Sequence, residues 1–408
     1  MKKRTFRRGA AALSALAMSL LLAALSVGAR LPDQYYVANG SALSLFEHDP
    51  LLSADLARGS FPLAVYRSSG NSFPVQLRML GVAVKEVDVQ VVDRRVVQLG
   101  GTPFGIKLTT DGVMVVGMGQ VQTQQENLVN PAWQAGIREG DVILSLDGRT
   151  VSSKKEVSQA VADCDGRPVE VTYRRGEQLR SCSVQPVRSQ LDGQYHLGLW
   201  VRDSSAGIGT LTFRDPDTGA FAGLGHAICD VDTGQIMPLS QGQIVSATIT
   251  GVQPGAAGAP GQLQGTFTSA DACGQLLLNS AAGVYGRCDN APAYAQTIPL
   301  AQMQEVRPGP AKMVTTIQGQ KPRWFDIEIE RVSLDRTEPT RNMVVHIVDP
   351  ELLEASGGIV QGMSGSPIVQ DGMLVGAVTH VFVNDPTRGY GIFAENMYST
   401  MSSLPQAG

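Results

Sequence analysis

The residues that could do chemistry gather near the C-terminal end, between Ile359 and Asn384. At the centre of this stretch Ser364 stands between glycines in the run Gly362-Met363-Ser364-Gly365-Ser366-Pro367, with apolar residues on both sides. A serine hydroxyl is a weak nucleophile until a base takes its proton and N–H groups receive the oxyanion that forms. Glycines allow the dihedral angles that point successive N–H groups into one small hole. The run therefore predicts a nucleophilic serine on a tight turn, although these residue types are also common in ordinary turns.

A nucleophilic serine needs an imidazole within hydrogen-bond reach, and the second ring nitrogen needs a partner that fixes the tautomer. Of the five histidines, His226, His346 and His380 lie in the C-terminal block. His226 stands between small residues in GLGHAI, after an expected strand, so its ring should be accessible at a loop. His346 lies within an expected strand, where a structural role is favoured. His226 is therefore the candidate general base.

Two further residues are candidates for the same site. Asp349 ends the expected strand that contains His346 and precedes a proline. It could orient His226, or it could start a turn, and the local sequence favours the turn. His380 follows Ser364 on an expected strand that returns past the nucleophile.

The composition limits the kind of protein that positions these residues. The chain has 408 residues, 43% hydrophobic and 17% charged, which suits two or three folded domains. Its 45 glycines and its lack of long helix-period stretches favour a mainly β fold. A net charge of −4 gives no basic field for nucleic acid, so nucleic acid is not an expected partner.

Five cysteines form no C-x-x-C pair, so the sequence indicates neither a zinc site nor a redox motif, and no metal or other cofactor is expected. An exported chain could pair some of them, with Cys273 and Cys288 the nearest in sequence. Because an odd number leaves at least one free, we expect mostly unpaired, buried thiols.

The N-terminus resembles a targeting segment. Residues 1–8 carry five Lys or Arg, and residues 9–29 carry no charge. Such a pattern is typical of a secretory signal, here with a small-residue cleavage site at Ala29, or of a retained membrane anchor. We expect residues 1–30 to be this signal peptide or anchor helix, with the chain after Arg30 outside the cytoplasmic face. Residues 31–99 read as an N-terminal β module or spacer.

Residues 100–188 have a different pattern. The segment AGIREGDVILSLDG combines a helix end, a Gly-Asp turn, a buried strand and a hairpin turn, and Ser152 or Ser153 could cap a following helix. The region resembles a PDZ domain of the bacterial protease-associated type. By this resemblance, a peptide ligand would be held by a carboxylate-binding loop. That loop would comprise Gly101, Thr102, Pro103, Phe104, Gly105 and Ile106.

Residues 189–408 consist of short β-type runs separated by Gly/Pro turns, and the size suits two small β-barrels. The Gly362–Pro367 run has the G-x-S-G-[SG]-P form of chymotrypsin-like serine proteases. This resemblance implies a double β-barrel with Ser364 as nucleophile and the N–H groups of Gly362 and Ser364 as oxyanion hole. Some such proteases that cut after Glu or Gln carry a histidine on the returning strand, so Thr379 and His380 would shape the substrate pocket.

The order of these parts, with GLGHAI and the block from Ile347 to Ile392, resembles the SpoIVB peptidase family of sporulation signalling serine proteases. The resemblance implies a triad of His226, Asp349 and Ser364, although Asp349 lies unusually close to Ser364 for a chymotrypsin-like enzyme. It also implies export across the forespore membrane into the intermembrane space, membrane anchoring before self-processing, and cleavage of a membrane-bound inhibitor of an intramembrane metalloprotease, which triggers sigma-K activation.

Two alternatives stay open. A non-catalytic PDZ adaptor would need none of the three triad residues. A general envelope quality-control protease with a PDZ domain has the protease first, which is the reverse of the order here.

Overall fold

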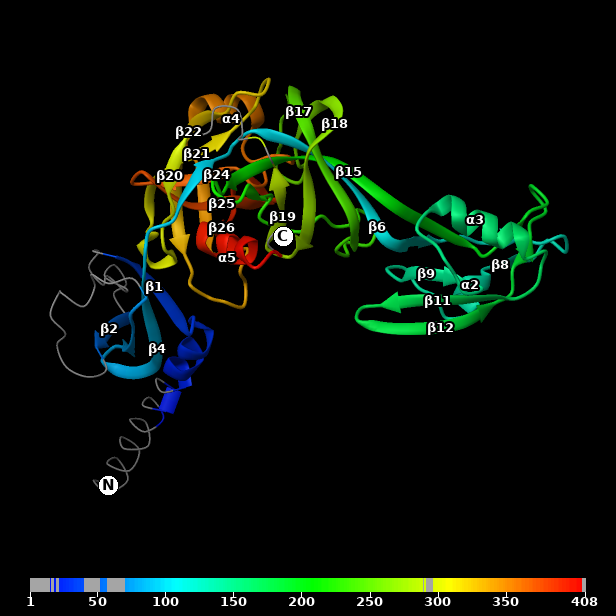
Figure 1. The fold of residues 1–408 in the computed structure, drawn as a ribbon, viewed down its shortest axis with the longest axis horizontal. Coiled ribbons are helices and arrows are strands. Elements are labelled where there is room, and N and C mark those ends of the chain that lie inside the picture. The colour runs from blue at the N-terminus through cyan, green and yellow to red at the C-terminus, as the bar shows by residue number, and fades with distance from the viewer. Residues whose placement is uncertain are drawn as a thin grey trace, which may run out of the picture.

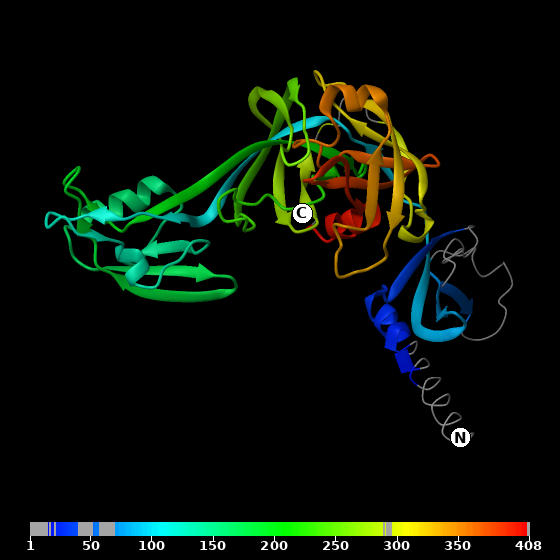
Figure 2. The ribbon, with the colours of Figure 1, turned by 180° about the vertical axis from the view of Figure 1, so that it is seen from behind.

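The computed structural model describes residues 15, 18–19, 22–39, 52–56, 70–288, 290 and 296–405. These residues are mainly β and form three parts, which Figures 1 and 2 show from opposite sides. An N-terminal module lies at one end, two barrels lie in the middle, and a smaller domain stands at the far end of a long two-stranded arm.

The N-terminal module begins with helical residues 22–30 and continues as a four-stranded sheet of order β1-β4-β3-β2. Alternate valines of its longest strand are buried, which is the pattern of a sheet with one face on a core. Among the described residues no helix is long and apolar enough to cross a bilayer. Most of the expected targeting segment lies outside the described residues. The strands are β1 (Gln34–Ala38), β2 (Leu52–Leu56), β3 (Ser72–Met79) and β4 (Val82–Val92).

The first barrel is a ring of six strands in the order β6-β17-β18-β19-β16-β15, closed by pairing of β15 with β6. Two short strands, β5 and β20, extend this sheet beside β15. The strands are β5 (Val96–Leu99), β6 (Pro103–Met118), β15 (Leu199–Arg214), β16 (Ala220–Gly223), β17 (Leu239–Gln253), β18 (Gln262–Ser280), β19 (Gly283–Cys288) and β20 (Thr297–Pro299).

The smaller domain is inserted into this barrel, between β6 and β15, and we call it the insert domain (residues 113–201). Both strands run on from the barrel into it, so β6 pairs with β17 up to Thr110 and with β9 from Val113. The expected boundaries at 100 and 188 therefore do not match the fold, because residues 100–110 are part of the barrel. The reason is that β6 is one continuous strand that pairs first with β17 and then with β9, whereas the polar run at residues 109–112 looks like a turn in the sequence.

The insert domain packs its sheet around a small apolar core, with Ile143 and Val171 fully buried. Ser153 caps α3 through a capping box with Glu156, which confirms one of the two expected caps. Its elements are β7 (Val121–Gln122), β8 (Leu128–Val129), α2 (Pro131–Gln134), β9 (Val142–Leu146), β10 (Arg149–Thr150), α3 (Lys154–Asp163), β11 (Val169–Arg175), β12 (Gln178–Val184), β13 (Val187–Arg188) and β14 (Tyr195–His196).

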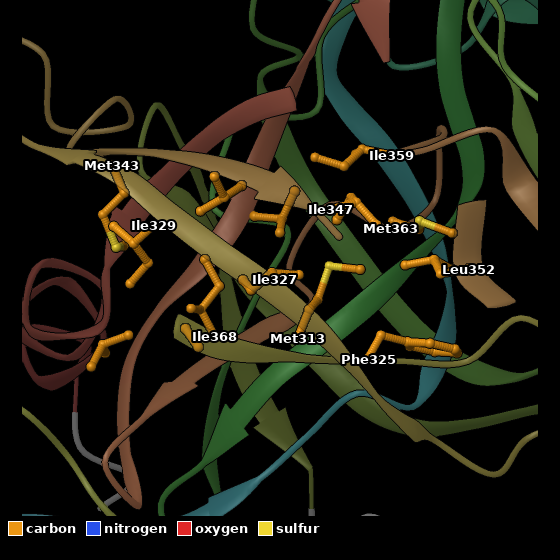
Figure 3. Close-up of a cluster of buried hydrophobic side chains, with 14 of the residues drawn as sticks. Met313, Phe325, Ile327, Ile329, Met343, Ile347, Leu352, Ile359, Met363 and Ile368 are labelled. Carbon is orange, nitrogen blue, oxygen red and sulfur yellow. The ribbon is translucent and has the colours of Figure 1, made fainter. Parts of the chain in front are cut away.

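The second barrel is closed by six strands in the order β21-β22-β23-β26-β25-β24. Figure 3 shows its core, a cluster of buried apolar side chains that includes Phe325 and Ile368, with Met313 drawn between them. Two barrels are present, as the sequence predicted. The elements after β20 are η2 (Met303–Glu305), β21 (Gly309–Thr315), β22 (Arg323–Val332), β23 (Met343–Ile347), α4 (Pro350–Ser356), β24 (Pro367–Gln370), β25 (Met373–Phe382), β26 (Asp385–Phe393) and α5 (Ala394–Ser402).

Candidate active site

Ser364 lies on the turn between α4 and β24, where the two barrels meet. Its neighbour Met363 is fully buried in the core of the second barrel (Figure 3), which fixes the turn on one side. Gly362 and Gly365 have φ angles of +96° and +90°, a region that favours glycine. A Cβ on Gly365 would lie only 2.2 Å from the carbonyl oxygen of Thr210, so this position also needs glycine for space.

Strand β15 of the first barrel donates hydrogen bonds to carbonyl groups of the turn that carries Ser364. The backbone N–H of Thr210 donates to the carbonyl of Ser364 (3.1 Å), and its hydroxyl donates to the carbonyl of Gly362 (2.8 Å). The hydroxyl of Thr212 donates to the carbonyl of Gly365 (2.8 Å). Within the described part of the chain, the N–H groups of Gly362 and Ser364 donate to no protein group. The predicted oxyanion donors are thus free to receive a ligand oxygen.

The hydroxyl of Ser364 donates to the backbone carbonyl of Thr379 on β25, at 2.9 Å. No hydrogen bond joins it to His226 in this structure. The side chain of Thr379 is buried and donates to the carbonyl of Thr340 at 2.9 Å. It is therefore the backbone of Thr379, and not its side chain, that contacts the serine.

His226 lies on the loop that follows β16, next to the nucleophile turn. Its predecessors Leu224 and Gly225 both have positive φ angles, and a Cβ on Gly225 would lie 2.9 Å from the side chain of Thr379. The His226 loop and the strand behind Ser364 are therefore in close contact. Sequence reasoning found both partners, because each is marked by glycines around one polar residue.

The Nδ1 atom of His226 lies 2.8 Å from the carbonyl oxygen of Ala227. Because a carbonyl can only accept, Nδ1 carries the hydrogen and Nε2 has a lone pair available for a proton. Burial lowers the pKa of His226 from its ordinary value of 6.5. The ring is therefore neutral near pH 7, in the tautomer that a general base requires.

The ring of His380 lies against the ring of His226. The ring centroids of His226 and His380 are 4.9 Å apart, with the planes tilted by 38°. Burial, together with the nearby charges of His226 and Arg341, lowers the pKa of His380 to about 4. His380 therefore adds a second neutral imidazole to the site. Whether it also shapes the substrate pocket, as predicted, stays a prediction.

Asp349 does not contact His226 in this structure. It is the N-cap of α4: one carboxylate oxygen accepts from the N–H groups of Glu351 (3.0 Å) and Leu352 (3.1 Å), and the other accepts from the N–H of Asp326 (3.1 Å). The alternative in which Asp349 starts a turn before proline is the one that the geometry supports. The group that fixes the tautomer of His226 is instead the carbonyl of Ala227, which no side-chain pattern could reveal.

The expected carboxylate-binding loop lies in the first barrel and not in the insert domain. The stretch from Gly101 to Ile106 belongs to the first barrel, where the N–H of Gly101 donates to Leu211 (2.7 Å) and its carbonyl accepts from Thr316 (2.9 Å). The following residues pair with β15 and β17. A glycine-flanked loop before a strand is common to barrels and PDZ domains, so the pattern did not distinguish them. These residues cannot bind a ligand of the insert domain.

The insert domain has a groove elsewhere, between α3 and the start of β15. A cavity of about 710 Å³ is lined by Val157 and Val161 of α3, by Leu197–Val201 and by Val121. Gly198 has a φ of +77° within the run Leu197-Gly198-Leu199. This apolar-Gly-apolar run could have indicated a ligand loop. The groove and the nucleophile turn are bordered by opposite ends of the same strand, β15.

An ion pair that sequence reasoning missed connects β15 with the loop after His226. Arg202 donates to the carboxylate of Asp230, whose side chain is 0% exposed, and to Asp232 at 2.8 Å. Asp230 also accepts from the N–H of Thr233 (2.9 Å) and so closes the loop. Among the described residues, no cluster of three or more His, Cys, Asp or Glu is arranged to hold a metal ion.

Comparisons with known proteins bear on both parts. A family model described as SpoIVB peptidase S55 matches residues 193–398, which is half of the chain, and a PDZ domain model matches residues 130–175. The putative zinc metalloprotease CPE1693 of Clostridium perfringens is 28% identical over 93 residues, 21% of this chain and 28% of the relative. The serine protease HTRA1 of Xenopus laevis is 43% identical over 56 residues, 14% of this chain and 12% of the relative. The chain thus spans less than a third of the length of these relatives.

Solved structures show only distant likeness. The PDZ domain of the SdrC-like protein from Listeria monocytogenes has a TM-score of 0.19 and 21% identity, over 23% of this chain and 90% of that one. The active form of the Rv3671c protease from M. tuberculosis has a TM-score of 0.28 and 13% identity, and the match covers 50% of this chain and 78% of that one. The match of the family model over half of the chain is decisive: the chain belongs to the SpoIVB peptidase S55 family, a family of serine endopeptidases, and carries a PDZ domain.

Proposed function

We propose that this chain is a serine endopeptidase in which Ser364 attacks the peptide bond and His226 is the general base. The observation that carries the proposal is the arrangement of the nucleophile turn. Strand β15 binds the carbonyls of the turn, two N–H groups stay unpaired, and an imidazole with a free Nε2 lies on the adjacent loop. Nucleophile, base and oxyanion donors are the parts that acyl transfer needs.

In the proposed reaction the hydroxyl of Ser364 leaves the carbonyl of Thr379 and donates instead to Nε2 of His226. As Oγ bonds to the substrate carbonyl carbon, its proton passes to Nε2, and the new oxyanion accepts from the N–H groups of Gly362 and Ser364. The protonated ring then gives the proton to the leaving amine. Water repeats the sequence to release the acyl group from Ser364.

The carbonyl of Ala227 takes the place that a carboxylate has in a Ser-His-Asp triad. It fixes the tautomer of His226 but carries no full charge, so it stabilises the imidazolium less than a carboxylate would. Burial also lowers the pKa of His226. The base form therefore persists to a lower pH than for an exposed histidine, and activity should extend below pH 6.5.

We further propose that the substrate is a membrane-bound protein, as the SpoIVB family resemblance implies: an inhibitor of an intramembrane metalloprotease, whose cleavage leads to sigma-K activation. The enzyme would act after export into the space between the forespore membranes and would process itself near its N-terminus. A peptide in the 710 Å³ groove of the insert domain would hold such a substrate close to the site. The unpaired donors and the free Nε2 favour this enzyme over a non-catalytic adaptor.

The test is cleavage by the full chain in detergent, followed by mass spectrometry of self-processing and of a peptide library. Ser364→Ala and His226→Ala are compared with Ser399→Ala, which removes an exposed hydroxyl on α5. We expect cleavage to disappear in the first two variants and to persist in the third. Cleavage that survives in folded Ser364→Ala would contradict the proposed nucleophile.

A further inference from the structure

Two cysteines of the first barrel lie together, on neighbouring strands β18 and β19. Gly274 of β18 pairs with Cys288 of β19, and Cys273 is the residue that precedes Gly274 in β18. In a regular ladder the side chains of 273 and 288 would point to opposite faces, because successive residues alternate. The ladder is not regular here.

A β-bulge brings the two side chains to the same side. On the other edge of β18, Ile244 pairs with Gly274, whereas the next residue, Val245, pairs with Ala272. Cys273 is the extra residue between them. A bulge of this kind turns its side chain away from the regular alternation. The bulge therefore allows the side chain of Cys273 to turn towards Cys288, although their positions in the ladder are one residue apart.

The contacts confirm that the two residues interact. The thiol of Cys288 donates to the carbonyl of Cys273 (3.0 Å), and the thiol of Cys273 lies 3.4 Å from the carbonyl of Ile244. The neighbouring Cys288 thiol lowers the pKa of Cys273 to about 6, and the same interaction raises the pKa of Cys288. Two neighbouring thiols, one of them with a lowered pKa, are the arrangement that thiol–disulfide exchange uses.

The pair is also accessible. Both cysteines are half-buried and line one cavity of about 230 Å³, with Arg214 and Ser246. The other three cysteines are elsewhere: Cys164 and Cys182 in the insert domain and Cys229 after His226. The sequence suggested this pairing from spacing alone, and the bulge and the shared cavity give it a physical basis.

We propose that Cys273 and Cys288 are a disulfide-forming pair that closes when the chain meets a small disulfide oxidant such as oxidised glutathione. The Cys273 thiolate attacks one sulfur of the oxidant, which releases one glutathione thiolate. Cys288 loses its proton, its sulfur attacks the sulfur of Cys273, and the second glutathione thiolate leaves. The two protein sulfurs are oxidised to a disulfide, and the oxidant disulfide is reduced to two glutathione thiolates. The protons that Cys273 and Cys288 give up are taken up by these thiolates, so the products are one protein disulfide and two glutathione thiols.

Closure would link β18 to β19, which in turn pairs with β16, the strand that precedes His226. Because the bond closes a loop of roughly 15 residues, it should restrict the unfolded chain and raise the melting temperature by roughly 5 °C. Neither cysteine has a hydrogen bond to Ser364 or His226, so the oxidised chain should be a stabilised form of the same barrel.

The experiment incubates the full chain with reduced or oxidised glutathione, blocks free thiols by alkylation and maps the peptides by mass spectrometry. We expect a peptide linking Cys273 to Cys288 in the oxidised sample, a loss of two free thiols, and a rise in melting temperature that dithiothreitol reverses. Cys229→Ser should behave like the unchanged chain, whereas Cys273→Ser should form no such peptide. A glutathione adduct on Cys273 as the end product, or five free thiols after oxidation, would overturn the proposal. The mapping is done on the unchanged chain, so it does not depend on the folding of any variant.

Discussion

Replacing Asp349 by asparagine separates two roles that the residue could have. In the structure its carboxylate caps α4 by accepting from three backbone N–H groups. Asparagine caps helices about as well as aspartate, because its side-chain oxygen can still accept from the N–H groups of Glu351 and Leu352. Its amide nitrogen cannot accept, so the bond from the N–H of Asp326 is lost. Asp349→Asn should therefore keep the cap and the fold at a modest cost in stability.

The two roles predict effects of very different size. Asp349→Ala loses the cap and the bond from Asp326 and should cost about 2 kcal/mol of stability, whereas Asp349→Asn loses only the bond from Asp326 and should cost about 1 kcal/mol. If Asp349 instead oriented His226 as a triad carboxylate, the asparagine variant would lower kcat by about 10⁴, because the amide favours the wrong tautomer. That is a difference of about 5.5 kcal/mol in the activation free energy.

The assay compares kcat for a cleaved reporter peptide with the urea midpoint of the same preparations. We expect Asp349→Asn to keep kcat within about threefold, and Asp349→Ala to lose stability but to keep most of its activity when folded. A fall in kcat of more than about 10³ in Asp349→Asn, with a urea midpoint no lower than that of Asp349→Ala, would refute the reasoning and return Asp349 to the triad.

Three further substitutions test other parts of the structure. Gly365→Ala places a Cβ 2.2 Å from the carbonyl of Thr210 at a positive φ, so we expect a loss of at least about 10² in cleavage rate, measured on soluble, folded protein. Arg202→Gln leaves the buried carboxylate of Asp230 without its partner and should lower the free energy of unfolding by about 2 kcal/mol or more, with Arg202→Lys less affected; equal urea midpoints for all three would contradict this. Burial raises the pKa of Glu395 to about 7, so the folded state keeps a proton that the unfolded chain releases above pH 4.5, and stability falls as pH rises between these values. Glu395→Gln should therefore stabilise the chain by up to about 3 kcal/mol at pH 8 and by almost nothing at pH 4, in urea titrations at the two values.

The sequence predicted the nucleophile turn and the His226 loop because both depend on local backbone geometry. Gly362 and Gly365 have positive φ angles, and the backbone of β15 lies close to Gly365. Both conditions favour glycine, so they are visible in the sequence. The two-barrel fold was predictable for a similar reason, since short alternating runs separated by turn residues mark strands.

The parts that the sequence did not reveal depend on long-range contacts. Strands β6 and β15 continue from a barrel into the insert domain, although each contains a polar run with glycine that looks like a turn in the sequence, so the insertion and the true groove were hidden. The Gly101–Ile106 loop has a local sequence that suits either domain. The tautomer of His226 depends on the backbone carbonyl of Ala227. Every residue has such a carbonyl, so the sequence does not indicate which one lies beside the ring.

The central claim is that Ser364 is a nucleophile activated by His226, and covalent labelling tests it most directly. A fluorophosphonate probe reacts with a serine only when a base removes its proton. We predict a single labelled serine, mapped by mass spectrometry to Ser364, with labelling abolished in His226→Ala and retained in Ser399→Ala. An unlabelled Ser364 in a folded chain, or labelling that is unchanged in His226→Ala, would contradict the account.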